Sequence, residues 1–274
     1  MQASSTSKSA APTSDPSSTP SSPPTSPSPS PSSPPSIPPT TCPPHTYTTQ
    51  IISLDPLLIY ITNFLSPSES THLIHLGTPL LTPSPQIGHA ATPQSRTSWS
   101  APLPASDPTT ACVLSRASSF LGTLLSPGRD TIGPSQMVRY TPGQKFDIHT
   151  DWFAKPRIDD EDIATGRRRL YNRVATLFVV LQANHTAGGE TWFPRVRPVT
   201  PQDRVPVEKG EAVWREHEEG GLAFKAVPGN ALFWVNLMAN GSGDARTVHA
   251  GLPVEGGTKH AMNIWPRVYF GPDA

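Results

Sequence analysis

The sequence predicts a mainly β domain, a sandwich or barrel, preceded by a few helices and an N-terminal tail. From residue 136 onward, apolar and β-branched residues recur with a period of two, in short runs separated by Gly, Pro and Asn. Such strands, with no helical pattern between them, favour a sandwich or barrel. The predicted strands are 137–140, 145–152, 174–182, 231–237, 246–252 and 260–270.

The first 44 residues form the predicted tail. They hold 14 of the 35 prolines, whereas all six Trp and all nine Phe lie beyond them. So few apolar side chains cannot offset the entropy lost on ordering, so we predict disorder over 1–44 and one domain over 45–274. The tail is either a docking arm for a proline-binding module or an inert spacer.

The elements that precede the β-rich region are predicted from local signals. An apolar, partly alternating run over 51–61, broken at Pro56, predicts one or two strands. Ser66-Pro67-Ser68-Glu69 is a capping box with proline at the first helical position, and Gly77 ends that helix. Asp107-Pro108 opens a second helix, which Gly122 or Pro127 ends. The charged insertions 155–170 and 195–227 are interpreted as loops.

Composition limits the partners and the compartment. Lys plus Arg (21) equals Asp plus Glu (21), so no strong field attracts nucleic acid or an anionic membrane. The longest apolar stretches, 57–61 and 177–181, are far shorter than the ~20 residues of a membrane span. No leader is legible in 1–30, so a soluble cytoplasmic protein is the expectation. Cys42 and Cys112 indicate neither a disulfide framework nor a zinc site.

One short motif carries candidate chemistry. On a strand, His149 and Asp151 would project from the same face, because they are two residues apart. An imidazole and a carboxylate are two thirds of the facial triad that binds Fe(II) and leaves coordination positions open. His249, 98 residues after Asp151, is the candidate third ligand from a distant strand.

The motif alone is weak evidence. With nine His and twelve Asp in the chain, chance predicts about 0.4 His-x-Asp triplets. A rival group, His217-Glu218-Glu219, has no apolar flanks and is interpreted as a solvated loop.

Three further residues are candidate contacts of a 2-oxoglutarate co-substrate. Lys259 could bind its far carboxylate, or be an ordinary surface lysine. Tyr140 could donate its phenol to the co-substrate, or be a core aromatic. Thr176 could add a hydrogen bond, or be a satisfied strand threonine.

Together with further blocks of sequence, these residues resemble the prolyl 4-hydroxylase alpha-subunit-like branch of the Fe(II)/2-oxoglutarate dioxygenases, with the greatest likeness to fungal members. The resemblance spans roughly residues 50–270. Besides the motif residues, the blocks that carry it are 63–66, 96–98, 140–146, 173–181, 188–194, 229–234 and 244–265. Two departures, Gln182 in place of the usual Asn and the absence of a cysteine pair from 195–227, concern the substrate rather than the metal.

The resemblance implies a double-stranded β-helix, or jelly roll, supported by N-terminal helices. It implies iron bound by His149, Asp151 and His249, with Lys259 anchoring 2-oxoglutarate. Tyr140 and Thr176 match positions near that co-substrate, and Trp265 matches an aromatic near the substrate or packs in the core.

The implied activity is hydroxylation of a prolyl residue in a peptide or protein, with O2 consumed, succinate and CO2 released, and ascorbate keeping the iron reduced. The alternatives are a small-molecule hydroxylase on the same iron platform, a redox-inert structural metal, and a non-catalytic interaction or sensor protein that works through its Pro-rich tail. Relatives of the collagen type work in the endoplasmic reticulum, which makes that compartment the alternative to the cytoplasm.

Overall fold

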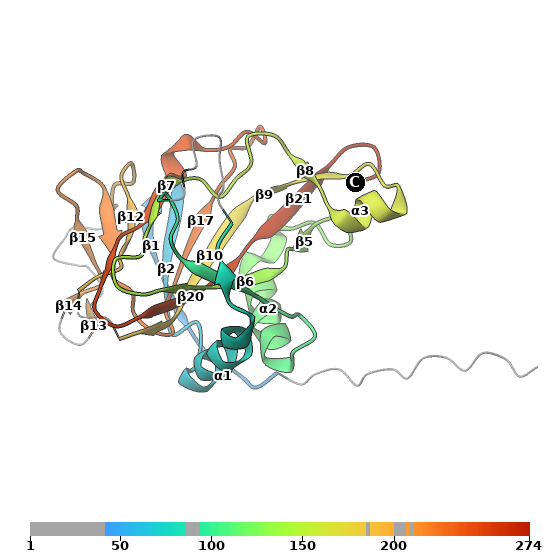
Figure 1. Cartoon of the computed structure of the whole chain (residues 1–274). Helices are drawn as coiled ribbons and strands as arrows, with labels where there is room; N and C mark the ends of the chain where they lie inside the picture. The colour runs from blue at the N-terminus through green and yellow to red at the C-terminus, as the bar shows by residue number, and fades with distance from the viewer. Residues whose placement is uncertain (1–41, 86–91, 93, 185–186, 200–206, 209–210) are drawn as a thin grey trace, which may run out of the picture. The chain divides into compact units, whose positions relative to one another are not determined.

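The computed structural model describes residues 42–85, 92, 94–184, 187–199, 207–208 and 211–274. Two antiparallel sheets form its centre (Figure 1). The larger contains, in spatial order, β1 (Thr48–Leu54), β2 (Leu57–Thr62), β17 (Ala231–Val235), β10 (Ala175–Ala183), β20 (Lys259–Ile264), β6 (Ser135–Tyr140), β4 (Trp99–Leu103) and β3 (Thr82–Pro83). The smaller contains β15 (Trp214–Glu216), β16 (Leu222–Phe224), β12 (Thr191–Phe193), β18 (His249–Gly251) and β7 (Phe146–His149).

An apolar layer joins the two sheets. Leu58 and Trp234 of the larger sheet pack in one buried cluster with Phe193, Trp214 and Phe224 of the smaller sheet. Alternate residues of each strand supply this layer, as the period-two pattern predicted. The mainly β fold with helices near the N-terminus is therefore confirmed.

Two helices cover the other face of the larger sheet (Figure 1). The first, α1 (Pro67–Gly77), begins at the predicted capping box, in which Ser66 accepts from the Glu69 main chain and the Glu69 carboxylate accepts from the Ser66 N–H. The second, α2 (Pro108–Leu121), is capped by the Asp107 carboxylate. Both helices begin where the sequence predicted.

The insertions interpreted as loops contain regular structure, so that interpretation was wrong. Residues 155–170 form β8 (Arg157–Ile158) and helix α3 (Asp160–Thr165), which Asp159 caps at the start and the left-handed Gly166 caps at the end. Both capping signals were present and were overlooked because the stretch lacks an apolar stripe. In the second insertion β15 and β16 pair as a hairpin, held by buried Trp214, Leu222 and Phe224.

A third, four-stranded sheet lies beside the other two and carries α3 (Figure 1). Its strands are β5 (Thr131–Ile132), β21 (Pro266–Phe270), β9 (Leu170–Arg173) and β8. Two short pairs complete the strands, β11 (Ala187–Gly188) with β19 (Val254–Glu255) and β13 (Val207–Glu208) with β14 (Glu211–Ala212). Single 3₁₀ turns span Thr78–Leu80, Gly122–Leu124 and Ala245–Thr247.

The predicted tail and domain boundary stay predictions, because residues 1–41 lie outside the described part of the chain. Among the helices in the described ranges, none combines the length and hydrophobicity that crossing a bilayer requires.

Cys42 and Cys112 form a disulfide bond, which corrects the expectation from the sequence. Their Cα atoms lie 5.4 Å apart although 70 positions separate them in the chain. Two cysteines with no characteristic spacing give no signal of pairing; only the fold brings the segment before β1 against the buried side of α2.

Replacing both cysteines with serine is expected to lower the free energy of unfolding by about 2–4 kcal/mol, because the crosslink restricts the unfolded chain over a long loop. Urea denaturation of the oxidised protein and the double variant measures the difference. Dithiothreitol should bring the wild type to the stability of the variant and leave the variant unchanged. A wild type insensitive to dithiothreitol would contradict the expectation.

Candidate metal centre

Two histidines meet across neighbouring strands. His149 ends β7 and His249 begins β18, and the two residues are direct partners in the antiparallel register. Their ring centroids lie 4.2 Å apart. The sheet thus brings together two imidazoles that are 100 positions apart in sequence.

Each imidazole is oriented by its own main chain. His149 Nδ1 lies 2.8 Å from the Asp147 carbonyl oxygen, and His249 Nδ1 lies 3.0 Å from that of Thr247. A carbonyl oxygen only accepts, so both Nδ1 atoms carry the proton. Both Nε2 atoms therefore present a lone pair to the site.

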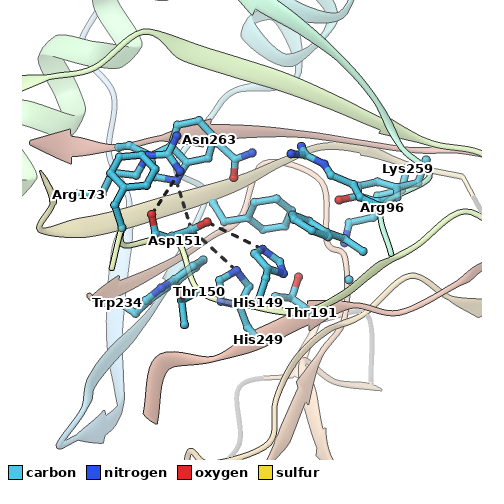
Figure 2. Close-up of a pocket in the computed structure, with 16 residues that line it drawn as sticks. Arg96, His149, Thr150, Asp151, Arg173, Thr191, Trp234, His249, Lys259 and Asn263 are labelled. Atoms are coloured by element: carbon cyan, nitrogen blue, oxygen red, sulfur yellow. Dashed lines mark hydrogen bonds and ion pairs between the residues drawn. The ribbon is translucent and has the colours of Figure 1, made fainter. Parts of the chain in front are cut away.

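Asp151 completes the group. Strand β7 ends at His149, short of the predicted 152, so Asp151 reaches the site from the bend that follows. Its Oδ1 lies 3.9 Å from His149 Nε2, and its Oδ2 lies 3.8 Å from His249 Nε2. Figure 2 shows the three side chains pointing toward one another, and one ligand atom from each lies within 4.8 Å of the others.

The protonation states suit a metal ion. Burial, together with the neighbouring His249, lowers the pKa of His149 to about 3, so its imidazole is neutral at pH 7. Burial alone would raise the pKa of Asp151, but the adjacent imidazoles, Arg173 and the Thr176 hydroxyl hold it at about 2. Neutral imidazoles with a carboxylate are the donor set of a divalent transition metal, so these residues fit such an ion.

Thr176 contacts the carboxylate. Its hydroxyl donates to Asp151 Oδ2 at 2.7 Å and accepts from the Asn236 amide at 2.9 Å. The order is fixed because an ionised carboxylate only accepts. Trp265 donates its indole N–H to the same Oδ2 at 3.2 Å. Two donors therefore hold one carboxylate oxygen, and Oδ1 is the freer of the two.

A pocket of about 610 Å³, including its open mouth, lies between the sheets at this group. Its polar and charged lining residues include all three candidate ligands, and Thr176 does not line it. Figure 2 shows the Asp151 end of the pocket and, at the far end, Lys259.

Lys259 is a buried cation without an acidic partner. It is 2% exposed, and its ammonium donates to the Gly189 carbonyl at 2.6 Å. In the described part of the chain no carboxylate forms an ion pair with it. Burial lowers the pKa of Lys259 to about 8, against a smaller upward effect of Glu190. A buried charge is costly unless paired, so this end of the pocket is suited to a carboxylate ligand.

Tyr140 lines the pocket beside this lysine, whose ammonium lies 5.7 Å from the ring centroid. Burial raises the pKa of Tyr140, so the phenol stays protonated. The rival group at His217 lies in the turn between β15 and β16, with Glu218 and Glu219 exposed, as predicted.

The lining residues that the sequence did not identify include two arginines and an asparagine: Arg96, Arg173 and Asn263. Arg96 is 4% exposed and lies 4.5 Å from the Phe146 ring centroid. Arg173 donates to the Asp151 carbonyl at 3.3 Å. Both arginines lie in blocks that carry the resemblance, and that was their only signal, since an isolated arginine has no motif.

Comparison with known proteins places these residues in context. Residues 135–267 match the sequence profile of the 2OG-Fe(II) oxygenase superfamily. The "Probable prolyl 4-hydroxylase 6" of Arabidopsis thaliana is 34% identical over 48% of this chain and 41% of its own length. The "Prolyl 4-hydroxylase subunit alpha-1" of Rattus norvegicus is 30% identical over 77% of this chain and 34% of its own length. This chain thus spans well under half of these curated relatives.

Among solved structures, the viral collagen prolyl hydroxylase of Paramecium Bursaria Chlorella virus-1, in its 2OG complex, superposes with a TM-score of 0.53. The match covers 77% of this chain and 96% of the viral one at 24% identity. At this identity the likeness concerns the fold, and it supports the predicted double-stranded β-helix. The relatives named here are plant, rodent and viral proteins, so the greater likeness to fungal members stays a prediction.

Proposed function

We propose that this protein is an Fe(II)- and 2-oxoglutarate-dependent dioxygenase that hydroxylates prolyl residues in peptides or proteins, because residues 135–267 match the sequence profile of the 2OG-Fe(II) oxygenase superfamily. The observation that carries the proposal is the convergence of His149, Asp151 and His249, with both Nε2 atoms free, at one end of a pocket that has a buried lysine at the other. A keto acid that chelates a metal at one end and carries a carboxylate at the other requires this arrangement of metal ligands and cation.

Residues of the pocket would bind the metal and 2-oxoglutarate. His149, Asp151 and His249 would hold Fe(II), and the Lys259 ammonium would bind the far carboxylate of 2-oxoglutarate, with Tyr140 beside it. When bound, iron, 2-oxoglutarate and O2 together supply the oxidant that converts a substrate C–H to C–OH as succinate and CO2 form. The walls of Phe146, Phe178 and Trp234 limit water around that reaction. Ascorbate would return oxidised iron to Fe(II) between turnovers.

The role of Thr176 is to position the metal ligand rather than to contact 2-oxoglutarate, because its hydroxyl hydrogen is donated to Asp151. The relay from Asn236 through Thr176, together with the Trp265 indole, holds Oδ2 and leaves Oδ1 for the metal. Such contacts orient a ligand and tune its affinity for the ion.

Replacing Thr176 with valine, which keeps the shape and removes the hydroxyl, is expected to weaken metal binding about 10- to 100-fold. Titration with Co(II), followed by its visible absorption, measures the affinity without turnover. Thr176→Ser, which keeps the hydroxyl, is the matched control and should bind nearly as tightly as the wild type. Equal affinities of the valine and serine variants would remove Thr176 from this role.

A prolyl substrate is supported by the names of the relatives and by the outer pocket, where Phe153, Arg173 and Trp265 offer flat surfaces to a peptide. A mass gain of one oxygen on proline peptides, after incubation with protein, Fe(II), 2-oxoglutarate and ascorbate, tests it. If peptides gain no oxygen but free metabolites stimulate succinate release, the substrate is a small molecule. If nothing stimulates 2-oxoglutarate consumption, the enzyme proposal itself fails.

The Cys42–Cys112 disulfide supports an oxidising compartment, such as the lumen of the endoplasmic reticulum, over the cytoplasm. Alkylation of free thiols in freshly lysed cells tests this, because a cytoplasmic protein would be labelled at both cysteines without prior reduction.

A further inference from the structure

The third sheet and the segment that joins α3 to β9 carry six arginines, which differ in their partners. Four of them form ion pairs with acidic side chains in the described residues: Arg167, Arg168, Arg169 and Arg267. The other two, Arg157 on β8 and Arg173 on β9, form no ion pair in the described part of the chain. The unpaired charges are therefore not scattered over this surface. They lie on the adjacent strands β8 and β9 (Figure 1), and Arg173 lines the pocket.

These two arginines belong to one stack of flat groups. The Arg173 guanidinium carbon lies 3.6 Å from the Trp265 ring centroid and 4.8 Å from that of Phe153. The Arg157 guanidinium carbon lies 3.9 Å from the Phe153 centroid. Trp265, Arg173 and Phe153 line the pocket, whereas Arg157 is exposed. The stack thus runs from the Asp151 carboxylate, which Trp265 contacts, out to solvent.

Stacking leaves the arginine donors free. A guanidinium that lies over an aromatic ring uses its face there, and its N–H groups point outward in the plane. For Arg157 no hydrogen bond to a described residue engages those N–H groups. A planar fork of donors held in place by a ring is the arrangement that binds a carboxylate through two hydrogen bonds.

The local charge also favours an anion. Asp159 is paired with Arg267. Among the described residues that line the pocket, Arg96, Arg173 and Lys259 are cations, whereas Asp151 is the only carboxylate and belongs to the candidate metal group. The mouth of the pocket therefore carries positive charge that a substrate can neutralise.

We infer that Arg157 binds an acidic side chain of the substrate, so that the preferred substrates are proline-containing peptides with Asp or Glu close to the hydroxylated residue. This rests on the proposed function. The distances along the stack are 3.6 Å from Trp265 to Arg173, 4.8 Å from Arg173 to Phe153 and 3.9 Å from Phe153 to Arg157. Together they equal the length of about three to four residues of extended chain. With the target proline beside Trp265, the acidic residue lies no more than about four positions from it.

The test uses pairs of fluorescent proline peptides that carry a single Glu, or Gln in its place, at each of the four positions on either side of the proline. Binding is measured by anisotropy on the full chain loaded with Mn(II) and 2-oxoglutarate without oxygen, so that turnover is not needed. At one or two positions the Glu peptide should bind about three- to tenfold more tightly than its Gln partner. High salt should reduce the difference, because the pair is exposed.

Arg157→Glu should abolish this preference and instead favour the peptide with Lys at the same position, with the effect also seen in KM during turnover. Arg168→Glu is the matched control. Arg168 is likewise an exposed arginine, but it pairs with Asp273 and lies outside the stack. This variant should therefore keep the preference for Glu.

Equal binding of Glu and Gln peptides at every position, or a preference that survives in Arg157→Glu, would overturn the inference and leave prolyl hydroxylation standing. The absence of binding and of oxygen gain with every peptide would overturn the proposed peptide function, and this inference with it. The two failures are thereby distinguished.

Discussion

Asp151→Ala and His149→Ala are expected to abolish succinate formation and to weaken metal binding by more than 100-fold. Loss of one of three ligands costs more than loss of a residue that only orients a ligand, which already costs about 10- to 100-fold. Asp151 is also the only anion of the group, so its removal leaves two neutral imidazoles to hold a divalent ion. Succinate release and Co(II) titration measure the two effects.

The Asp151 variant has a structural side effect that must be separated from the loss of metal. Thr176 and Trp265 would lose their acceptor, at about 1–3 kcal/mol per unsatisfied buried donor. Asp151→Asn keeps an acceptor oxygen there but removes the charge, so it should remain folded by circular dichroism and still fail to bind metal. The control pair is His217→Ala and Glu218→Ala, a histidine and an acid outside the group. Turnover retained by the Asp151 variants would end the metal assignment.

Lys259→Met is expected to raise the 2-oxoglutarate concentration required for half-maximal rate by about 30-fold or more. Removing one partner of a buried charge pair costs about 2–5 kcal/mol. The same substitution should stabilise the ligand-free fold, because a thioether at this 2% exposed position does not carry the desolvation cost of an ammonium. Weaker binding of 2-oxoglutarate together with a higher free energy of unfolding distinguishes the loss of the ligand contact from general damage to the fold.

The pH dependence gives a second measurement on the same lysine. With a pKa of about 8 in the ligand-free protein, Lys259 is charged below that pH, and affinity for 2-oxoglutarate should fall about tenfold per unit above it. Of the groups near it, Tyr140 has a raised pKa, and Glu190 forms an ion pair with Arg215. Lys259→Arg stays charged and should lose the dependence, whereas substitution of the partly exposed Lys145, Lys145→Met, should retain it. A flat profile in the wild type would mean that another cation binds the carboxylate.

The same pKa predicts the sign of a stability change. An unfolded lysine titrates near 10.4, so the folded pKa of about 8 is depressed. The cost of burying the charge is fully present below pH 8 and is relieved as the pH rises toward 10.4. The ligand-free wild type should therefore gain stability relative to Lys259→Met over that interval.

Local signals in the sequence predicted much of the fold. The capping box at Ser66, the Asp107-Pro108 start and the period-two runs depend only on neighbouring residues. The structure confirms both helix starts and has a strand in each run, but a 3₁₀ turn occupies Ala245–Thr247, where the predicted strand 246–252 begins. The disulfide depends on the path of the chain over 70 residues, and no spacing rule encodes it. Helix α3 has good caps but no apolar face, so periodicity could not reveal it.

The sequence predicted the site only in part, because some of its contacts depend on how distant strands pair. His149 and Asp151 are close in sequence, and His249 could be named only as a histidine at a suitable distance. Its pairing with His149 is a property of the β7–β18 register. Arg173 and Phe153 stack on each other in the fold, and no periodicity in the sequence indicates this contact.

Both candidate metal-binding imidazoles are oriented by carbonyl groups two residues earlier in the chain. Since every amino acid supplies that carbonyl, no side-chain substitution at Asp147 or Thr247 deletes the acceptor. The orientation of the two proposed ligands is thus insensitive to side-chain substitution at these two positions. Substitutions in the pocket walls that leave the local main chain in place keep both acceptors.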